Sequence, residues 1–128
     1  MTEIKARTTM YKGMTIEETI DLLTVAAAFD RRTIGEGDAV AWHAALGDLD
    51  FTDSREAVVA HYRERREWIM PADVRGRVRA IRDKRLNEGE KFLDPPSGLD
   101  GPAYQQWLIN ARRRIADGTD RPRALEMS

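Results

Sequence analysis

The sequence contains no cysteine and only two histidines among its 128 residues. The absence of cysteine excludes disulfide bonds, thiolate metal sites and cysteine nucleophiles. His43 and His61 lie on different predicted helices without metal-ligand spacing, so we interpret each as a side chain at the edge of the core. No phosphate-binding loop, dinucleotide fingerprint or nucleophile elbow occurs. We therefore expect a non-enzymatic binding protein with no metal and no cofactor.

Long apolar runs are also missing. No segment approaches the roughly 20 residues that a membrane span needs, and the first residues lack the apolar stretch of a signal peptide. We expect a cytoplasmic protein that does not enter a membrane. Hydrophobic residues make up 41% of the chain, which is enough for a globular core.

Charge is distributed unevenly, although the formal net charge is only −1. Residues 13–56 contain ten acidic and three basic residues, whereas residues 57–91 contain ten basic and six acidic residues. An acidic first half and a basic second half can serve partner binding, nucleic-acid contact or pairing within the chain.

Apolar residues recur at helical spacing, and no strand-like alternation is present. The first predicted helix begins at Thr15, which forms a capping box with Glu18. Asp38 is predicted to cap a second, short helix that ends at Gly47.

Two further helices follow in the predicted N-terminal domain. Asp53 and Glu56 have the spacing of a second capping box, opening a helix to about Arg66. Pro71 fits the first turn of a fourth helix, which runs from about residue 72 to residue 87. The apolar faces of the four helices predict a core made of Ile16, Ile20, Leu23, Phe29, Trp42, Leu46, Phe51, Val58, Tyr62, Val74, Val78 and Ile81.

The paired prolines Pro95 and Pro96 mark a boundary, because prolines and glycines together end regular structure. The predicted fold is therefore all-α, a small four-helix bundle with a linked C-terminal amphipathic helix. The predicted segments are a flexible arm at 1–12, the bundle at 13–90, a linker at 91–102, the C-terminal helix at 103–117 and a flexible tail at 118–128.

The C-terminal helix has one aromatic and aliphatic face, which either completes the core or docks on a partner. A tethered amphipathic helix commonly binds a groove, and its aromatic and arginine residues are types that dominate protein interfaces. The predicted partner-binding residues are Tyr104, Trp107, Leu108, Ala111, Arg112 and Ile115. Within this helix, residues 105–109 also resemble the pentapeptide that binds bacterial sliding clamps, although such ligands bind in extended form.

The fourth helix is rich in basic residues and could follow a phosphate backbone. These residues surround the helix instead of forming one stripe, and Asp73 and Asp83 dilute them. Direct nucleic-acid binding is therefore the second functional hypothesis, and its candidate contacts are Arg75, Arg77, Arg79, Arg82, Lys84 and Arg85.

Residues 15–86 carry a further pattern of loosely spaced helical motifs. These are Leu22-Leu23, Trp42 followed by Leu46, Asp50-Phe51, the Ala57–Tyr62 segment and Met70-Pro71 before Asp73. The pattern resembles small phage proteins that load and inhibit the replicative helicase, and related short helical proteins of actinobacteria and their phages. The resemblance implies a DNA-replication adaptor with a compact N-terminal helical domain and a flexible C-terminal segment that becomes ordered when it binds the hexameric helicase. Loading or inhibition, and the oligomeric state, stay open.

Overall fold

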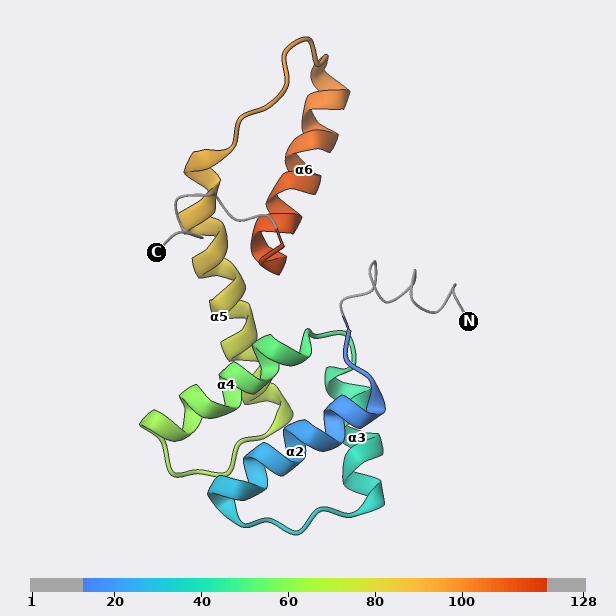
Figure 1. Cartoon of the computed structure of the whole chain (residues 1–128), viewed down its shortest axis with the longest axis vertical. Helices are drawn as coiled ribbons and strands as arrows, with labels where there is room; N and C mark the ends of the chain where they lie inside the picture. Colours follow the sequence, from blue (N-terminus) through green and yellow to red (C-terminus); the bar gives the residue numbers. More distant parts are fainter. Residues whose placement is uncertain (1–12, 120–128) are drawn as a thin grey trace. The chain divides into compact units, whose positions relative to one another are not determined.

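The computed structural model describes residues 13–119, which contain helices and no strand (Figure 1). The all-α prediction is confirmed. None of the helices in this range combines the length and the apolar composition that crossing a membrane requires. The predicted arm at 1–12 and the tail beyond residue 119 lie outside the described residues. The helices are α2 (Ile16–Asp30), α3 (Glu36–Leu46), α4 (Phe51–Glu64), α5 (Pro71–Gly89) and α6 (Gly101–Asp117), with a 3-10 turn, η1 (Glu90–Phe92), after α5.

The chain divides into two compact units. The first unit extends to Val78 and the second begins at Arg79, so α5 contributes residues to both. The segment predicted as a linker, 91–102, lies within the second unit, and only residues 93–100 are outside a helix. The grouping of residues 13–90 into one four-helix bundle stays a prediction.

The two ends of α2 are fixed by local hydrogen bonds. The Thr15 hydroxyl accepts the Glu18 N–H at 3.1 Å, and the Glu18 carboxylate accepts the Thr15 N–H at 2.9 Å. The predicted capping box is therefore confirmed. At the other end Arg31 takes a left-handed conformation with a φ of 66°. A residue with a side chain pays about 1–2 kcal/mol for this conformation, which glycine adopts freely.

Two predicted helix caps are wrong by less than one turn. Asp38 lies inside the first turn of α3, and its carboxylate accepts the Gly35 N–H at 2.8 Å. Asp53 lies inside α4, whose cap is Asp50, and the Asp50 carboxylate accepts the Asp53 N–H at 3.0 Å. Acidic residues are favoured throughout the first turn of a helix as well as at its cap, which explains why both starts were predicted too late.

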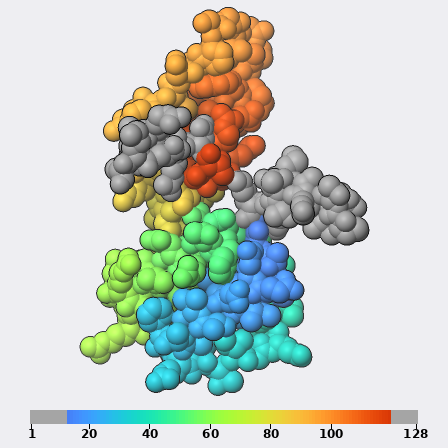
Figure 2. Space-filling model, viewed as in Figure 1, coloured from blue at the N-terminus to red at the C-terminus, as the bar shows by residue number. Residues whose placement is uncertain are grey.

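The core of the first unit lies where α2 packs against α3 and α4, as the adjacent blue and green surfaces in Figure 2 illustrate. The first turns of α5 add Val74 and Val78. Met14 and Ile69, which precede α2 and α5, are also buried although no helical pattern marks them. The buried apolar residues of this core are Met14, Leu22, Leu23, Ala26, Ala39, Trp42, Leu46, Ala57, Val58, Ile69, Val74 and Val78.

The predicted core is wrong at Ile20 and Phe29, which are 43% and 50% exposed. The buried face of α2 consists of Thr19, Leu22, Leu23 and Ala26. It is therefore rotated around the helix axis relative to the apolar face that the sequence predicted. Thr19 tolerates burial because its hydroxyl donates to the Thr15 carbonyl at 3.0 Å. Of the other predicted core residues, Ile16, Phe51 and Tyr62 are partly buried against the core, and Ile81 is half-buried in the second unit.

The burial of Trp42 generates the first prediction. Trp42 is only 6% exposed, so Trp42→Ala should lower the free energy of unfolding by about 3–5 kcal/mol through lost burial and a residual cavity. Val40 lies on the same helix but is 66% exposed, and Val40→Ala should change stability by less than about 0.5 kcal/mol. Urea denaturation of both variants measures the difference. Equal stabilities would contradict the assignment of the core.

Candidate functional site

The second unit is built around an antiparallel pairing of α6 with the second half of α5 (Figure 1). Arg82 donates to the Asp117 carboxylate at 2.5 Å, and Arg85 donates to the Ala116 carbonyl at 3.1 Å. Further along, Arg112 of α6 pairs with Glu90 in η1. Because residue numbers rise along α5 as they fall along α6, these contacts fix the register of the hairpin.

Gly89 allows the two helices of this hairpin to approach closely. A Cβ atom at Gly89 would lie 2.7 Å from Cγ2 of Ile115, closer than side chains tolerate. Ala111, Ile115 and Ala116 are buried in the second unit. Two alanines and one isoleucine are thus the whole buried apolar core among residues 79–119, which is little for an independently stable unit.

The predicted partner-binding residues separate into two groups. Ala111 and Ile115 are buried within the second unit, so their side chains are not on its surface. The second group is at least partly accessible: Trp107 and Leu108 are half-buried, and Tyr104 is 38% exposed. The Tyr104 ring stacks on the Trp107 ring with 6.4 Å between ring centroids. The Arg112 side chain forms an ion pair with Glu90.

The start of α6 runs past the end of η1, and apolar side chains remain exposed there. With Glu90 opposite Arg112, the residues of α6 before about residue 110 lie beside the non-helical segment 93–100 and not beside α5. Four large apolar side chains in this region are between 36% and 50% exposed. We call them the hairpin tip: Phe92, Leu99, Tyr104 and Ile109.

Most of the basic residues of α5 are engaged within the chain. In the first unit Arg75 makes two hydrogen bonds to Asp48, at 2.7 and 3.0 Å, and Arg77 pairs with Glu64 at 3.0 Å. In the second unit Arg82 and Arg85 hold α6. Of the six predicted nucleic-acid contacts, only Arg79 and Lys84 are exposed and form no ion pair with another residue of 13–119. The six residues are therefore not assembled into one cationic surface.

The pairing of Arg75 with Asp48 also affects their ionisation. The hydrogen bond from Arg75 lowers the pKa of Asp48 below its ordinary value and outweighs the opposing effect of burial. Both side chains are largely open to solvent, with 39% and 64% exposure, so their pairing adds little to stability.

The pentapeptide at residues 105–109 lies entirely within α6. The Gln106 side chain donates to the side chain of Asn110 one helical turn later, at 3.1 Å. Clamp ligands of this type bind in extended form, so clamp binding would require the first half of α6 to unfold.

The two histidines have structural hydrogen bonds. His43 contacts the Met14 carbonyl through Nε2 at 3.1 Å, and His61 contacts the Glu67 carbonyl through Nε2 at 2.7 Å. Across residues 13–119, no three His, Cys, Asp or Glu residues gather in a metal-binding arrangement.

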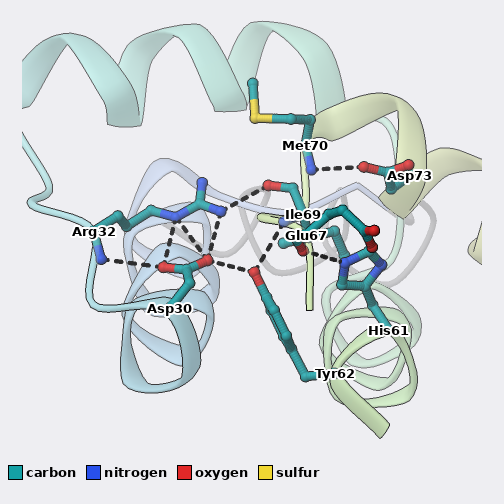
Figure 3. A network of polar contacts seen from close by, with 8 residues as sticks. All are labelled: Asp30, Arg32, His61, Tyr62, Glu67, Ile69, Met70 and Asp73. Carbon is teal, nitrogen blue, oxygen red and sulfur yellow. Dashed lines mark hydrogen bonds and ion pairs between the residues drawn. The ribbon is translucent and has the colours of Figure 1, made fainter. Parts of the chain in front are cut away.

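A buried polar network joins the elements of the first unit (Figure 3). Arg32 donates to both carboxylate oxygens of Asp30, with Nη2 at 2.6 Å from Oδ2, and the same Nη2 donates to the Ile69 carbonyl at 2.7 Å. The Tyr62 hydroxyl donates to Asp30 at 2.5 Å and accepts the Ile69 N–H at 2.9 Å. The Asp30 and Arg32 side chains are 2% and 9% exposed, so this ion pair is shielded from solvent.

Two tryptophans enclose the guanidinium group of this network. The Cζ atom of Arg32 lies 5.1 Å from the Trp42 ring centroid and 5.0 Å from that of Trp68, within the range of a cation–π contact. Burial would raise the pKa of Asp30, but the hydrogen bonds from Arg32 and Tyr62 outweigh it and lower that pKa. Burial, followed by the contact with Asp30, raises the pKa of Tyr62.

Sequence reasoning missed this network, because the contacts that join Asp30 and Arg32 to Tyr62 and Ile69 span more than 30 residues of the chain. The available signal was the spacing of Asp30 and Arg32 at the end of an apolar helix, which by itself indicates only a polar loop.

Comparison with known proteins adds no relative: no family model, no curated protein and no solved structure matches this chain.

The Asp30–Arg32 pair generates the second prediction. Asp30→Asn leaves a buried cation without its partner and should lower the free energy of unfolding by about 3 kcal/mol at pH 7. The carboxylate pKa is lower in the folded protein than its ordinary value of 3.8, so this group stabilises the fold above about pH 4. The difference between wild type and variant should therefore shrink as the pH falls through the folded-state pKa.

Urea denaturation between about pH 2 and pH 7 measures this difference. Asp21→Asn is the matched control, because Asp21 is an exposed carboxylate on the same helix. It should change stability at pH 7 by less than about 0.5 kcal/mol. A difference between wild type and Asp30→Asn that stays constant over the whole pH range would contradict the role of the ionised Asp30.

Proposed function

We propose that this protein is a non-enzymatic adaptor of DNA replication that binds a replicative helicase, as loader or inhibitor, through the hairpin tip. The observation that carries the proposal is the exposure of the large apolar side chains of the hairpin tip, two of which, Tyr104 and Ile109, lie on α6. Aromatic and aliphatic residues of this kind, presented on a helix, are suited to insertion into a groove of a protein partner.

The small core of the second unit supports a binding role for it. Its buried apolar side chains are Ala111, Ile115 and Ala116, and the rest of the hairpin is held by ion pairs and hydrogen bonds. Partner binding at the tip would extend this core by covering Tyr104 and Ile109. The loose resemblance of residues 15–86 to phage helicase loaders and inhibitors supplies the choice of partner.

A DNA-binding regulator that uses α5 is the less favoured alternative. Arg75, Arg77 and Arg82 would have to exchange their carboxylate partners for phosphates, which reduces the gain from each contact. A sliding-clamp ligand is also less favoured, because its motif is helical in α6. DNA binding differs from helicase binding in its strong salt dependence. Clamp binding differs from helicase binding in its need for Gln105.

The third prediction tests the hairpin tip. Tyr104→Ala combined with Ile109→Ala should weaken binding to a purified replicative helicase by about tenfold or more, since apolar anchors of an interface each contribute about 1 kcal/mol or more. Both residues are exposed, so the helical content and the unfolding midpoint should change little. Isothermal titration calorimetry measures the affinity, and circular dichroism checks the fold.

Gln105→Ala is the matched control, because it changes an exposed neighbour on the same helix. It should leave helicase affinity unchanged, whereas it would abolish clamp binding. Helicase affinity should vary little between about 50 and 200 mM salt, a range in which phosphate-driven binding falls steeply. No binding by the wild-type protein, or equal binding by the double variant, would refute the proposal.

A further inference from the structure

Two exposed aromatic rings lie at the edge of the buried network of the first unit. Phe29 is 50% exposed and Trp68 is 55% exposed. One face of Phe29 stacks on Tyr62, with 5.0 Å between centroids and 19° between planes, and one side of Trp68 is covered by the Arg32 guanidinium. Each ring is thus supported from within by a residue of the network and open to solvent elsewhere.

Both rings belong to one corner of this unit. Tyr62, which supports Phe29, also binds the Ile69 N–H next to Trp68. Arg32, which supports Trp68, binds Asp30 next to Phe29. Figure 3 shows these supporting residues meeting between the end of α2, the end of α4 and the segment 65–70. We call Phe29 and Trp68 the aromatic platform.

Three exposed arginines lie within three residues of the platform in the sequence. Arg31 follows Phe29 by two residues, and Arg65 and Arg66 precede Trp68 by three and two residues. All three are exposed, and none forms a side-chain hydrogen bond or ion pair with another residue of 13–119. Their positive charge complements the C-terminal ends of α2 and α4, a structural role that any basic residue would fill.

Helix-end electrostatics does not explain the backbone conformation of Arg31. It occupies the left-handed position at the end of α2, where glycine would fit without strain. Strained positions of this kind concentrate at functional sites. The corner also keeps two large aromatic rings exposed, which helix-end electrostatics does not require.

We propose that this corner binds single-stranded nucleic acid, with bases stacking on the aromatic platform and phosphates contacting Arg31, Arg65 and Arg66. Rigidly supported aromatic faces beside free arginines are the elements that bind single strands without sequence preference. The proposal does not depend on the hairpin tip, which lies in the other unit.

An acidic peptide would satisfy the arginines equally well, but it would not use flat rings that are open on one side. Duplex DNA keeps its bases stacked inside, so it would reach the arginines alone. Glu67 is exposed between Arg66 and Trp68 and opposes phosphate binding there, but the three arginines of the corner outnumber it. Single-stranded nucleic acid is therefore the ligand class that uses both features.

Titration of the full chain into a fluorescently labelled oligothymidylate tests the proposal by anisotropy. Arg31→Gly should weaken binding several-fold and lower the salt slope by about one, because one phosphate contact is lost. It should keep or raise the thermal unfolding midpoint, because it relieves the left-handed strain. Trp68→Ala should weaken binding about tenfold while leaving the salt slope unchanged, because stacking involves no counterion release.

Arg55→Gln is the matched control, since Arg55 is exposed on α4 about 15 Å along the helix from Arg65. It should bind the oligothymidylate like the wild type. Trp68→Phe retains a ring and should recover most of the affinity, which separates stacking from a general loss of structure. A duplex of equal length should bind more weakly than the single strand.

Three outcomes would overturn the proposal. The first is no binding of the oligothymidylate by the wild-type chain at about 50 mM salt. The second is affinity that neither Arg31→Gly nor Trp68→Ala reduces. The third is equal competition by polyglutamate, which would indicate an acidic polypeptide as the ligand. Helicase binding by the hairpin tip is measured separately, so failure of either proposal leaves the other standing.

Discussion

The ion pair between Asp30 and Arg32 is the constraint on which the first unit depends. Asp30 ends α2, and its carboxylate also accepts the Tyr62 hydroxyl of α4. Arg32 reaches the Ile69 carbonyl and lies between Trp42 of α3 and Trp68. A buried pair of this kind contributes modest net stability but allows few alternative arrangements, because each charge must keep its partner. The segment that leads from α4 to α5 is thereby fixed relative to three helices.

Much of the fold follows from local patterns in the sequence. The capping box at Thr15 and Glu18 and the proline that opens α5 each act within one turn, so each could be predicted. The rotation of the α2 face could not, because it depends on a threonine that is buried with its hydroxyl bonded to the backbone. The burial of Met14 and Ile69 likewise comes from tertiary packing outside the helices.

The candidate sites were predictable in composition but not in arrangement. The sequence locates the basic residues of α5, yet whether they are free depends on Asp48, Glu64 and Asp117, which are 13 to 35 residues away. The aromatic face of α6 was also recognisable. Which end of that face is buried and which is exposed depends on the register of α6 against α5 and η1. Arg82 and Arg112 fix this register. Charge counted along the chain therefore overestimates the charge that is available on the surface.

The division of the chain inside α5 affects how the protein can be dissected. The proline-containing segment 93–100 is the obvious place to cut, but a cut there removes α6 and leaves α5 intact. Such a truncated chain exposes the surface near Gly89 that Ile115 covers. It also releases Arg82 and Arg85 from their contacts with α6. The fragment would expose an apolar surface and two arginines that α6 engages in the whole protein, so its binding to other molecules would report on surfaces that the intact chain conceals.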